Sequence, residues 1–264
     1  MKRSPIAWIG GKQLDSEFVL QFIPEHVKVF SEPFAGGLSI SFEMLAKERV
    51  CKKLIINDLD TDLINFWKAI KDNTFLTNYP IITKFEVLEK EWEKIIAAEK
   101  LEPWQFFLKS RLCWGSRVNK QNVTLSALAF IKNYHLNNIP KLAKATNLFN
   151  SVKTEFYNTR YDLLKEEEGC FYYFDPPYCG VSKNLYKHED FNYLEFNNYL
   201  RNLKGKWLLS MNDTAETREI FKEWNQLEWE KEYSMRGAAE SRKEKGKELL
   251  IANYPLLVKE KNNV

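Results

Sequence analysis

The stretch VKVFSEPFAGG, residues 27–37, indicates the fold class of this chain. Its first four residues, VKVF, are typical of a short buried strand, and a glycine turn follows at Gly36. The apolar pattern from Ile40 to Lys47 predicts a helix after that turn. Strand, glycine turn and helix make the first half of a nucleotide-binding unit, so the sequence predicts an α/β fold.

An acidic residue follows the next predicted strand. The apolar run from Leu54 to Ile56 ends at Asn57 and Asp58, and Asp58 comes about twenty residues after the glycine turn. A carboxylate at that distance, on the tip of the second strand, is placed to bind ribose hydroxyls. Asp60 is placed to cap a helix that begins directly afterwards.

The middle of the chain differs from its two ends. Residues 74–158 are expected to be helical and basic, without a strand pattern that continues the sheet, so we expect an inserted domain there. The sheet is expected to resume at residues 171–174 and 207–209, on either side of a capped helix near 192–203. Two late strands, near 227–234 and 248–254, are joined by a polar loop and predict an antiparallel hairpin.

Residues 175–178, Asp-Pro-Pro-Tyr, follow the apolar run FYYF and form an acceptor-rich strand end. Both prolines lack an N–H, so Asp175 and the Pro176 carbonyl offer hydrogen-bond acceptors without a competing donor. Tyr178 adds a ring that can stack on a flat base. Such a group suits an exocyclic amine on a nucleobase; the alternative is a simple turn that leaves a strand.

Composition limits the classes of protein to which the chain can belong. It has 264 residues, a net charge of +3 and four cysteines, without a C-x-x-C pair or a histidine cluster, so no metal site is expected. The basic N-terminus is followed by an apolar stretch that Gly10, Gly11 and Lys12 interrupt, which argues against a signal peptide. No run is long enough to span a membrane, so we expect a soluble cytoplasmic protein.

Positive charge is concentrated in two segments. Residues 101–154 carry eight basic residues and one acidic residue, interleaved with aromatic ones, and the loop from Arg236 to Lys247 carries five basic and two acidic residues. An excess of this kind is typical of a surface that binds phosphates, although a solvated face would show it too. The candidate nucleic-acid contacts are Lys109, Arg111, Arg117, Asn119, Lys120, Arg236, Arg242 and Lys243.

Four motifs, taken in order, resemble those of the Dam-type, or D12 class, DNA adenine-N6 methyltransferases. They are WIGGK at 8–12, EPFAGG at 32–37, Asn-Asp at 57–58 and DPPY at 175–178, and the resemblance extends over most of the chain. Their order resembles the α group of that family, in which the recognition segment precedes the catalytic motif.

The resemblance implies a Rossmann-like fold that uses S-adenosylmethionine, with an antiparallel strand in the C-terminal hairpin. It implies a catalytic domain at 1–73 and 159–264 and a helical target-recognition domain at 74–158. By position, the expected cofactor residues are Trp8, Gly10, Lys12, Phe34, Gly36, Asp58, Asp162 and Asp175. Leu38 stands where family members often have a glycine, and the recognition segment differs enough that no target sequence is predicted.

The predicted chemistry is methyl transfer to the N6 amine of adenine. Asp175 and Pro176 would accept its two N–H bonds and Tyr178 would stack on the base, which must be flipped out of the duplex. No metal is implied. The sequence leaves three settings open for such an enzyme: a restriction endonuclease partner, a phage role and a regulatory role. The alternatives are an RNA or amide methyltransferase, a catalytically silent DNA-binding relative and a nucleotide-binding dehydrogenase.

Overall fold

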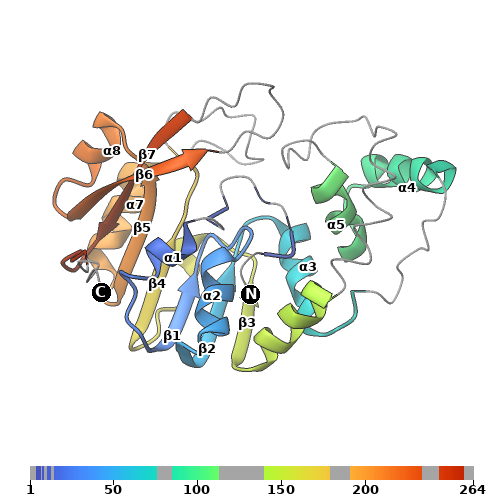
Figure 1. Ribbon diagram of the computed structural model, residues 1–264, viewed down its shortest axis with the longest axis horizontal. Helices are drawn as coiled ribbons and strands as arrows, with labels where there is room; N and C mark the ends of the chain where they lie inside the picture. The colour runs from blue at the N-terminus through green and yellow to red at the C-terminus, as the bar shows by residue number, and fades with distance from the viewer. Residues whose placement is uncertain are drawn as a thin grey trace, which may run out of the picture.

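The computed structural model describes residues 4–6, 8, 11–12, 15–75, 85–112, 140–178, 191–233 and 244–258. Within them, a seven-stranded sheet has the strand order β3-β2-β1-β4-β5-β7-β6 (Figure 1). The strands are β1 (Val27–Glu32), β2 (Val50–Asn57), β3 (Lys153–Tyr157), β4 (Cys170–Phe174), β5 (Lys206–Asn212), β6 (Asn225–Tyr233) and β7 (Glu244–Ala252).

The first five of these strands run parallel, and β7 pairs antiparallel with both β5 and β6. The predicted mixed α/β sheet and its late hairpin are therefore confirmed. From β1 the chain builds outward to β2 and β3, then crosses back to β4 on the other side of β1. That reversal leaves a crevice at the carboxyl ends of β1 and β4, where open α/β sheets bind ligands.

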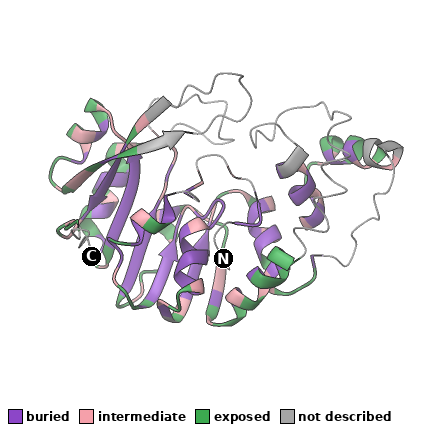
Figure 2. Cartoon of the chain, in the orientation of Figure 1, coloured by how far each residue is buried: buried purple, intermediate pink, exposed green. Residues whose placement is uncertain are grey.

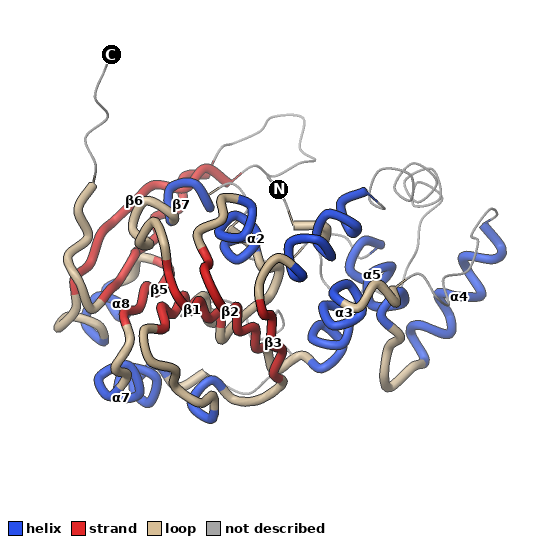
Figure 3. Tube along the Cα trace, turned by 90° about the horizontal axis from the view of Figure 1, so that it is seen from below, coloured by secondary structure: helices blue, strands red, loops and turns tan. Residues whose placement is uncertain are grey.

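Helices cover both faces of the sheet (Figure 3). The helices of the described part are α1 (Ser16–Val19), α2 (Ser39–Ala46), α3 (Thr61–Lys71), α4 (Phe85–Ala97), α5 (Pro103–Leu112), a helix at 140–150, the short 3-10 helix η2 (Tyr161–Leu163), α7 (Tyr193–Asn202) and α8 (Ala215–Ile220). Asp60 caps α3 by accepting the Asp62 and Leu63 amides, as the sequence predicts, and Asn192 caps α7 in the same way.

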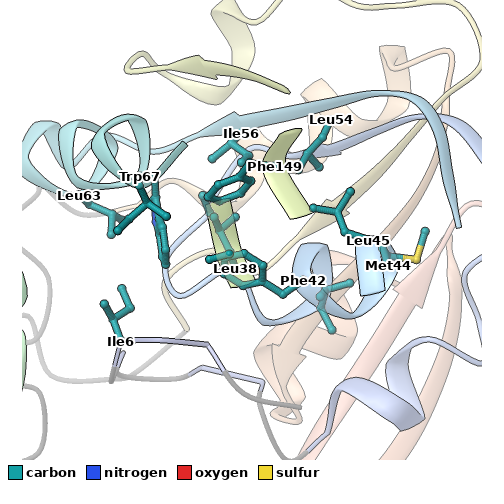
Figure 4. Close-up of a cluster of buried hydrophobic side chains, with 14 of the residues drawn as sticks. Ile6, Leu38, Phe42, Met44, Leu45, Leu54, Ile56, Leu63, Trp67 and Phe149 are labelled. Atoms are coloured by element: carbon teal, nitrogen blue, oxygen red, sulfur yellow. The ribbon is translucent and has the colours of Figure 1, made fainter. Parts of the chain in front are cut away.

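Alternate residues of each central strand enter two different cores, because successive side chains of a strand point to opposite faces. On β2, Leu54 and Ile56 join the core with α2 and α3, whereas Ile55 joins the core with α7 and α8. Figure 4 shows part of the first core, where Phe42 and Trp67 lie against Phe149. The central strands are buried on both sides (Figure 2), so packing on both faces holds the strand ends in place.

β3 was not predicted and lies inside the stretch expected to be the insert. It pairs parallel with β2, with Ile55 opposite Glu155, and the helix at 140–150 contributes Ala145 and Phe149 to the core. β3 has five residues and lies at the sheet edge with only Thr154 buried, so it lacks the apolar pattern of a central strand. Residues 140–157 thus include sheet and core elements, while α4 and α5 lie to one side, beyond α3 (Figure 1).

Candidate active site

The turn after β1 is shaped by a close approach of Trp8. Gly36 has φ +44, and a Cβ atom at this position would lie 2.6 Å from the Trp8 Nε1. Its amide donates to Asp58 Oδ2 over 3.0 Å, and its carbonyl accepts from the Trp67 indole over 3.1 Å. Glycine is therefore required here for both its conformation and its small size. The contact between Trp8 and Gly36 brings the motifs at 8–12 and 32–37 together.

Leu38 also adopts a left-handed conformation, with φ 55, at the start of α2. This conformation costs an ordinary residue about 1–2 kcal/mol, which explains why a glycine would be favoured at this place. The Leu38 side chain is buried in the core beside α2 (Figure 4), so its packing offsets the strain.

The tip of β2 is held rigidly by its two polar residues. Asp58 accepts the Gly36 amide with one carboxylate oxygen and the Asp60 amide with the other, over 3.0 and 2.9 Å. Buried Asn57 donates to the carbonyls of Pro33 and Thr159, over 2.9 Å each. The Asp58 carboxylate is thus fixed next to the glycine turn, and its oxygens are acceptors of the type that ribose hydroxyls require.

Asp162 belongs to η2 and Phe34 lies beside it, but the surroundings of the two side chains differ. The Phe34 ring packs against Tyr161, with centroids 5.5 Å apart, and against Phe191 at 5.6 Å. Asp162 instead forms a bidentate pair with Arg160, which lowers the pKa of its carboxyl. Its described contacts do not connect it to Asp58 or Asp175, so its assignment to the cofactor site stays a prediction.

A compact charged cluster surrounds Asp175 directly after β4. Lys12 Nζ lies 2.8 Å from Asp175 Oδ1 and also donates to the Tyr178 hydroxyl. The Tyr178 hydroxyl in turn lies 3.2 Å from Asp175 Oδ1. The Lys12 side chain is 2% exposed, against 21% for Asp175, so the acidic group is the accessible member of the pair.

Glu248 is the member of this cluster that sequence reasoning missed. Its carboxylate is 1% exposed and lies 3.8 Å from Lys12 Nζ and 3.4 Å from the Tyr178 hydroxyl. Burial, Asp175 and Glu248 together raise the pKa of Tyr178 well above its ordinary value. The hydroxyl therefore remains protonated and is a hydrogen-bond donor to these carboxylates.

Glu32, the last residue of β1, is a buried carboxyl close to the same cluster. Burial raises its pKa from 4.5 to about 8, and the charge of Asp175 adds to the shift. The Ser41 hydroxyl donates to it over 2.6 Å. At neutral pH Glu32 is mostly uncharged, so it adds little negative charge beside Asp175.

The loop after β4 is also pinned from α7. The Tyr193 hydroxyl donates to the Pro177 carbonyl over 3.0 Å, while Pro176 is buried. Proline conformation and this hydrogen bond together fix the backbone that carries Asp175 and Tyr178. Position 193 shows no pattern in the sequence that indicates this contact.

The predicted DNA contacts fall mostly outside the described residues. Lys109 and Arg111 lie on α5. Gly10, Arg117, Asn119, Lys120, Arg236, Arg242 and Lys243 lie outside the described ranges. In the part that the structure describes, no group of three or more metal-ligating side chains occurs, and no helix has both the length and the apolar character of a membrane span.

Comparison with known proteins finds a matching family and related proteins. Residues 8–235 match the model of a family described as D12 class N6 adenine-specific DNA methyltransferase. Type II methyltransferase M1.LlaDCHI of Lactococcus lactis subsp. cremoris is 25% identical over 272 residues, which cover 94% of each chain. Type II methyltransferase M.MjaIII of Methanocaldococcus jannaschii is 25% identical over 217 residues, covering 71% of this chain and 74% of its own.

Proposed function

Because the chain belongs to the D12 class of N6 adenine-specific DNA methyltransferases, we propose that Asp175 is the group that receives the target amine. The enzyme transfers a methyl group from S-adenosylmethionine to the N6 atom of adenine in DNA. The observation that carries the proposal is the position of Asp175, an accessible carboxylate at the carboxyl end of β4, held by buried Lys12. Membership of this family excludes two of the alternatives, a nucleotide-binding dehydrogenase and an amide methyltransferase.

The chemistry of the site fits the cofactor. Asp58 provides acceptors suited to ribose hydroxyls, and the Gly36 backbone with Trp8 forms the neighbouring wall. When bound, S-adenosylmethionine supplies a methyl group on a positively charged sulfonium. The Asp175 carboxylate is the accessible member of its pair with Lys12, and a negative charge at this place attracts a cation.

Asp175 and Pro176 would act by accepting hydrogen bonds. The N6 lone pair of adenine is delocalised into the ring, so the free amine is a weak nucleophile. Two acceptors at fixed positions favour a pyramidal nitrogen whose lone pair is available for bond formation. The Asp175 carboxylate also stabilises the positive charge that develops on N6, which is electrostatic catalysis by a preorganised group.

Tyr178 would hold the adenine after it leaves the duplex. Asp175 lies on a strand end beside buried groups, so a base inside a duplex would have to be flipped out to reach it. The Tyr178 hydroxyl is anchored by Lys12 and Asp175, which fixes the orientation of the ring that we propose stacks on the base.

DNA would be held by the segment that contains α4 and α5 and by the loop between β6 and β7. Both segments are rich in basic residues, and α5 carries Lys109 and Arg111. We propose that residues 74–139 form the main part of the recognition domain, with Arg117, Asn119 and Lys120 as DNA contacts. Arg236, Arg242 and Lys243 would add contacts from the hairpin loop.

A restriction endonuclease of the same target sequence is the partner that we propose in the cell. The support is that the relatives compared above are named Type II methyltransferases. This partner would be tested by cloning the neighbouring reading frames and assaying cleavage of unmethylated DNA.

The role of Asp175 is tested by single-turnover methylation. Asp175→Ala should abolish transfer, and Asp175→Asn, which keeps one acceptor but not the charge, should leave a trace, with the loss mainly in kcat. Asp213→Asn is the matched control, because Asp213 follows β5 at the same edge but pairs with Arg218. Near-wild-type rates for Asp175→Ala would exclude Asp175 as the reacting centre.

A further inference from the structure

Glu248 is a buried carboxylate that the role proposed for Asp175 does not explain. It is 1% exposed, and its described neighbours are the Lys12 ammonium at 3.8 Å and the Tyr178 hydroxyl at 3.4 Å. Removing a carboxylate from water is costly even when it is paired. A leucine or glutamine would fill the same place at lower cost, so the charge itself calls for an explanation.

The sheet topology places Glu248 beside the catalytic strand ends. β7 runs antiparallel to β5, and Glu248 pairs with Asn212, the last residue of β5. An antiparallel strand begins at the end of the sheet where the carboxyl ends of its parallel neighbours lie. Glu248, in the middle of β7, therefore lies level with the carboxyl end of β5, the strand that pairs with β4.

We propose that Glu248 is a positioning residue for methyl transfer, which holds Lys12 and Tyr178 so that Asp175 keeps its negative charge available to the amine. The inference rests on the role proposed for Asp175. Lys12 lies between the two carboxylates, at 2.8 Å from Asp175 and 3.8 Å from Glu248. Without the charge of Glu248, Lys12 and Asp175 would form a neutral pair, and Asp175 would be a weaker acceptor.

The same carboxylate also controls the Tyr178 hydroxyl. The charged and titratable groups facing that hydroxyl among the described residues are Lys12, Asp175, Glu248 and Tyr173. Two of them are carboxylates that keep the tyrosine protonated, and therefore able to donate toward Asp175 Oδ1 over 3.2 Å. Loss of one carboxylate would make this hydroxyl easier to ionise.

Glu248→Gln tests the proposal, because it keeps the side-chain shape and one acceptor but removes the charge. We expect kcat to fall by about tenfold to a hundredfold, the loss typical for a hydrogen bond to a charged group, with KM for DNA nearly unchanged. Glu228→Gln is the matched control: Glu228 lies on β6, paired at the surface with Arg218 and Lys247. This variant should keep the wild-type kcat.

A titration of Tyr178 gives a readout that does not depend on activity. The NMR signal of Tyr178 in protein with isotopically labelled tyrosine is the one that is absent in Tyr178→Phe. In Glu248→Gln this signal should titrate at lower pH than in the wild type. Glu248→Asp keeps the charge and should recover most of the lost kcat. If Glu248→Gln does not fold, Glu248→Asp decides, since its kcat and its Tyr178 titration should both stay close to wild type.

Three results would overturn the role of Glu248. They are a folded Glu248→Gln with wild-type kcat, a titration of Tyr178 that does not move in it, and a folded Glu248→Asp that has lost most of its kcat. Asp175→Ala in the same assay separates this inference from its basis. If this variant keeps its methyl transfer, the role of Asp175 is wrong, whereas an inactive Asp175→Ala with an unaffected Glu248→Gln refutes only the positioning role.

Discussion

At the scale of single residues, the site depends on groups whose charge is set by burial. Lys12 and Glu248 are almost fully buried, Asp175 is partly accessible, and Glu32 holds its proton at neutral pH. The result is one accessible carboxylate among groups that are either paired or neutral. This arrangement suits a reaction in which positive charge moves from a sulfonium to an amine.

The Tyr178 hydroxyl should contribute to the rate as well as the ring. Tyr178→Phe keeps the stacking face but removes the hydrogen bonds to Lys12 and Asp175, so kcat should fall about tenfold or more. Tyr178→Ala should be slower still, and both variants should bind DNA nearly as well as the wild type, because phosphate contacts dominate affinity. Single-turnover rates and DNA titrations check this order; a fully active Tyr178→Phe would assign the function of this residue to its ring alone.

Glu32 should make the stability of the fold depend on pH. Its pKa is about 8 in the folded state against 4.5 normally, so between these values the folded state holds the extra proton. The free energy of unfolding should then fall as pH rises through this window, by up to about 1.4 kcal/mol per pH unit. Glu32→Gln cannot ionise at this position, so its free energy of unfolding should fall less between the two pH values. Urea unfolding of both proteins at about pH 6 and about pH 7.5 measures this difference. Equal pH slopes for the two proteins would contradict the raised pKa.

At the scale of elements, the site is assembled from strand ends and the turns that follow them. The glycine turn after β1, the acidic tip of β2 and the Asp-Pro-Pro-Tyr loop after β4 each come from a local sequence pattern. The parallel register brings them together, with Ser31 of β1 opposite Ile55 of β2 and Tyr172 of β4.

Gly36→Ala should weaken cofactor binding through this turn. The added Cβ would lie 2.6 Å from the Trp8 indole, so Trp8 or the turn must move. Gly169→Ala is the control, since Gly169 also has a positive φ, +71, but its added Cβ would meet only the Lys28 side chain at 3.8 Å. Both variants should lose about 1–2 kcal/mol of stability from the left-handed backbone. Calorimetry should show weaker S-adenosylmethionine binding for Gly36→Ala alone; equal affinities would mean that Trp8 adjusts without effect on the site.

The sequence was sufficient for the elements with strong local signals. The strands β1, β2 and β4, the caps Asp60 and Asn192, and the hairpin were all predicted, because each depends on neighbours in the chain. β3 was missed because a short edge strand has no continuous apolar run. The contacts of Lys12 with Asp175 and Glu248 join residues far apart in the chain, so only the folded sheet shows them. For Glu248 a signal existed: a charge directly before the apolar run LLIA of an antiparallel strand lies at the edge where parallel strands end.

At the scale of the whole molecule, a rigid sheet carries the chemistry and basic segments outside it would hold the DNA. The central strands of the sheet are buried on both faces, while α4 and α5 lie to one side of the sheet (Figures 1 and 2). Such a division lets affinity for the duplex and the geometry of the reaction be changed separately.

Neutralising Lys109, Arg111, Arg117 and Lys120 together should weaken DNA binding and reduce its salt dependence. Each lost phosphate contact lowers the slope of log K against log salt by about 0.9. The control neutralises four exposed lysines near the opposite, amino-terminal ends of the strands, Lys28, Lys52, Lys204 and Lys206. Binding measured over a range of salt concentrations should show the smaller slope for the first set only. An unchanged slope would mean that the basic segment faces solvent.

The central claim is that this chain methylates the N6 atom of adenine in DNA, and that Asp175 is the residue that receives the amine. The most direct measurement is mass spectrometry of nucleosides from duplex DNA of mixed sequence, incubated with the enzyme and S-adenosylmethionine that carries an isotopically labelled methyl group. We predict labelled N6-methyl-deoxyadenosine with the wild type and none with Asp175→Ala. Label found on cytosine, or on adenine to the same extent with Asp175→Ala, would contradict the account.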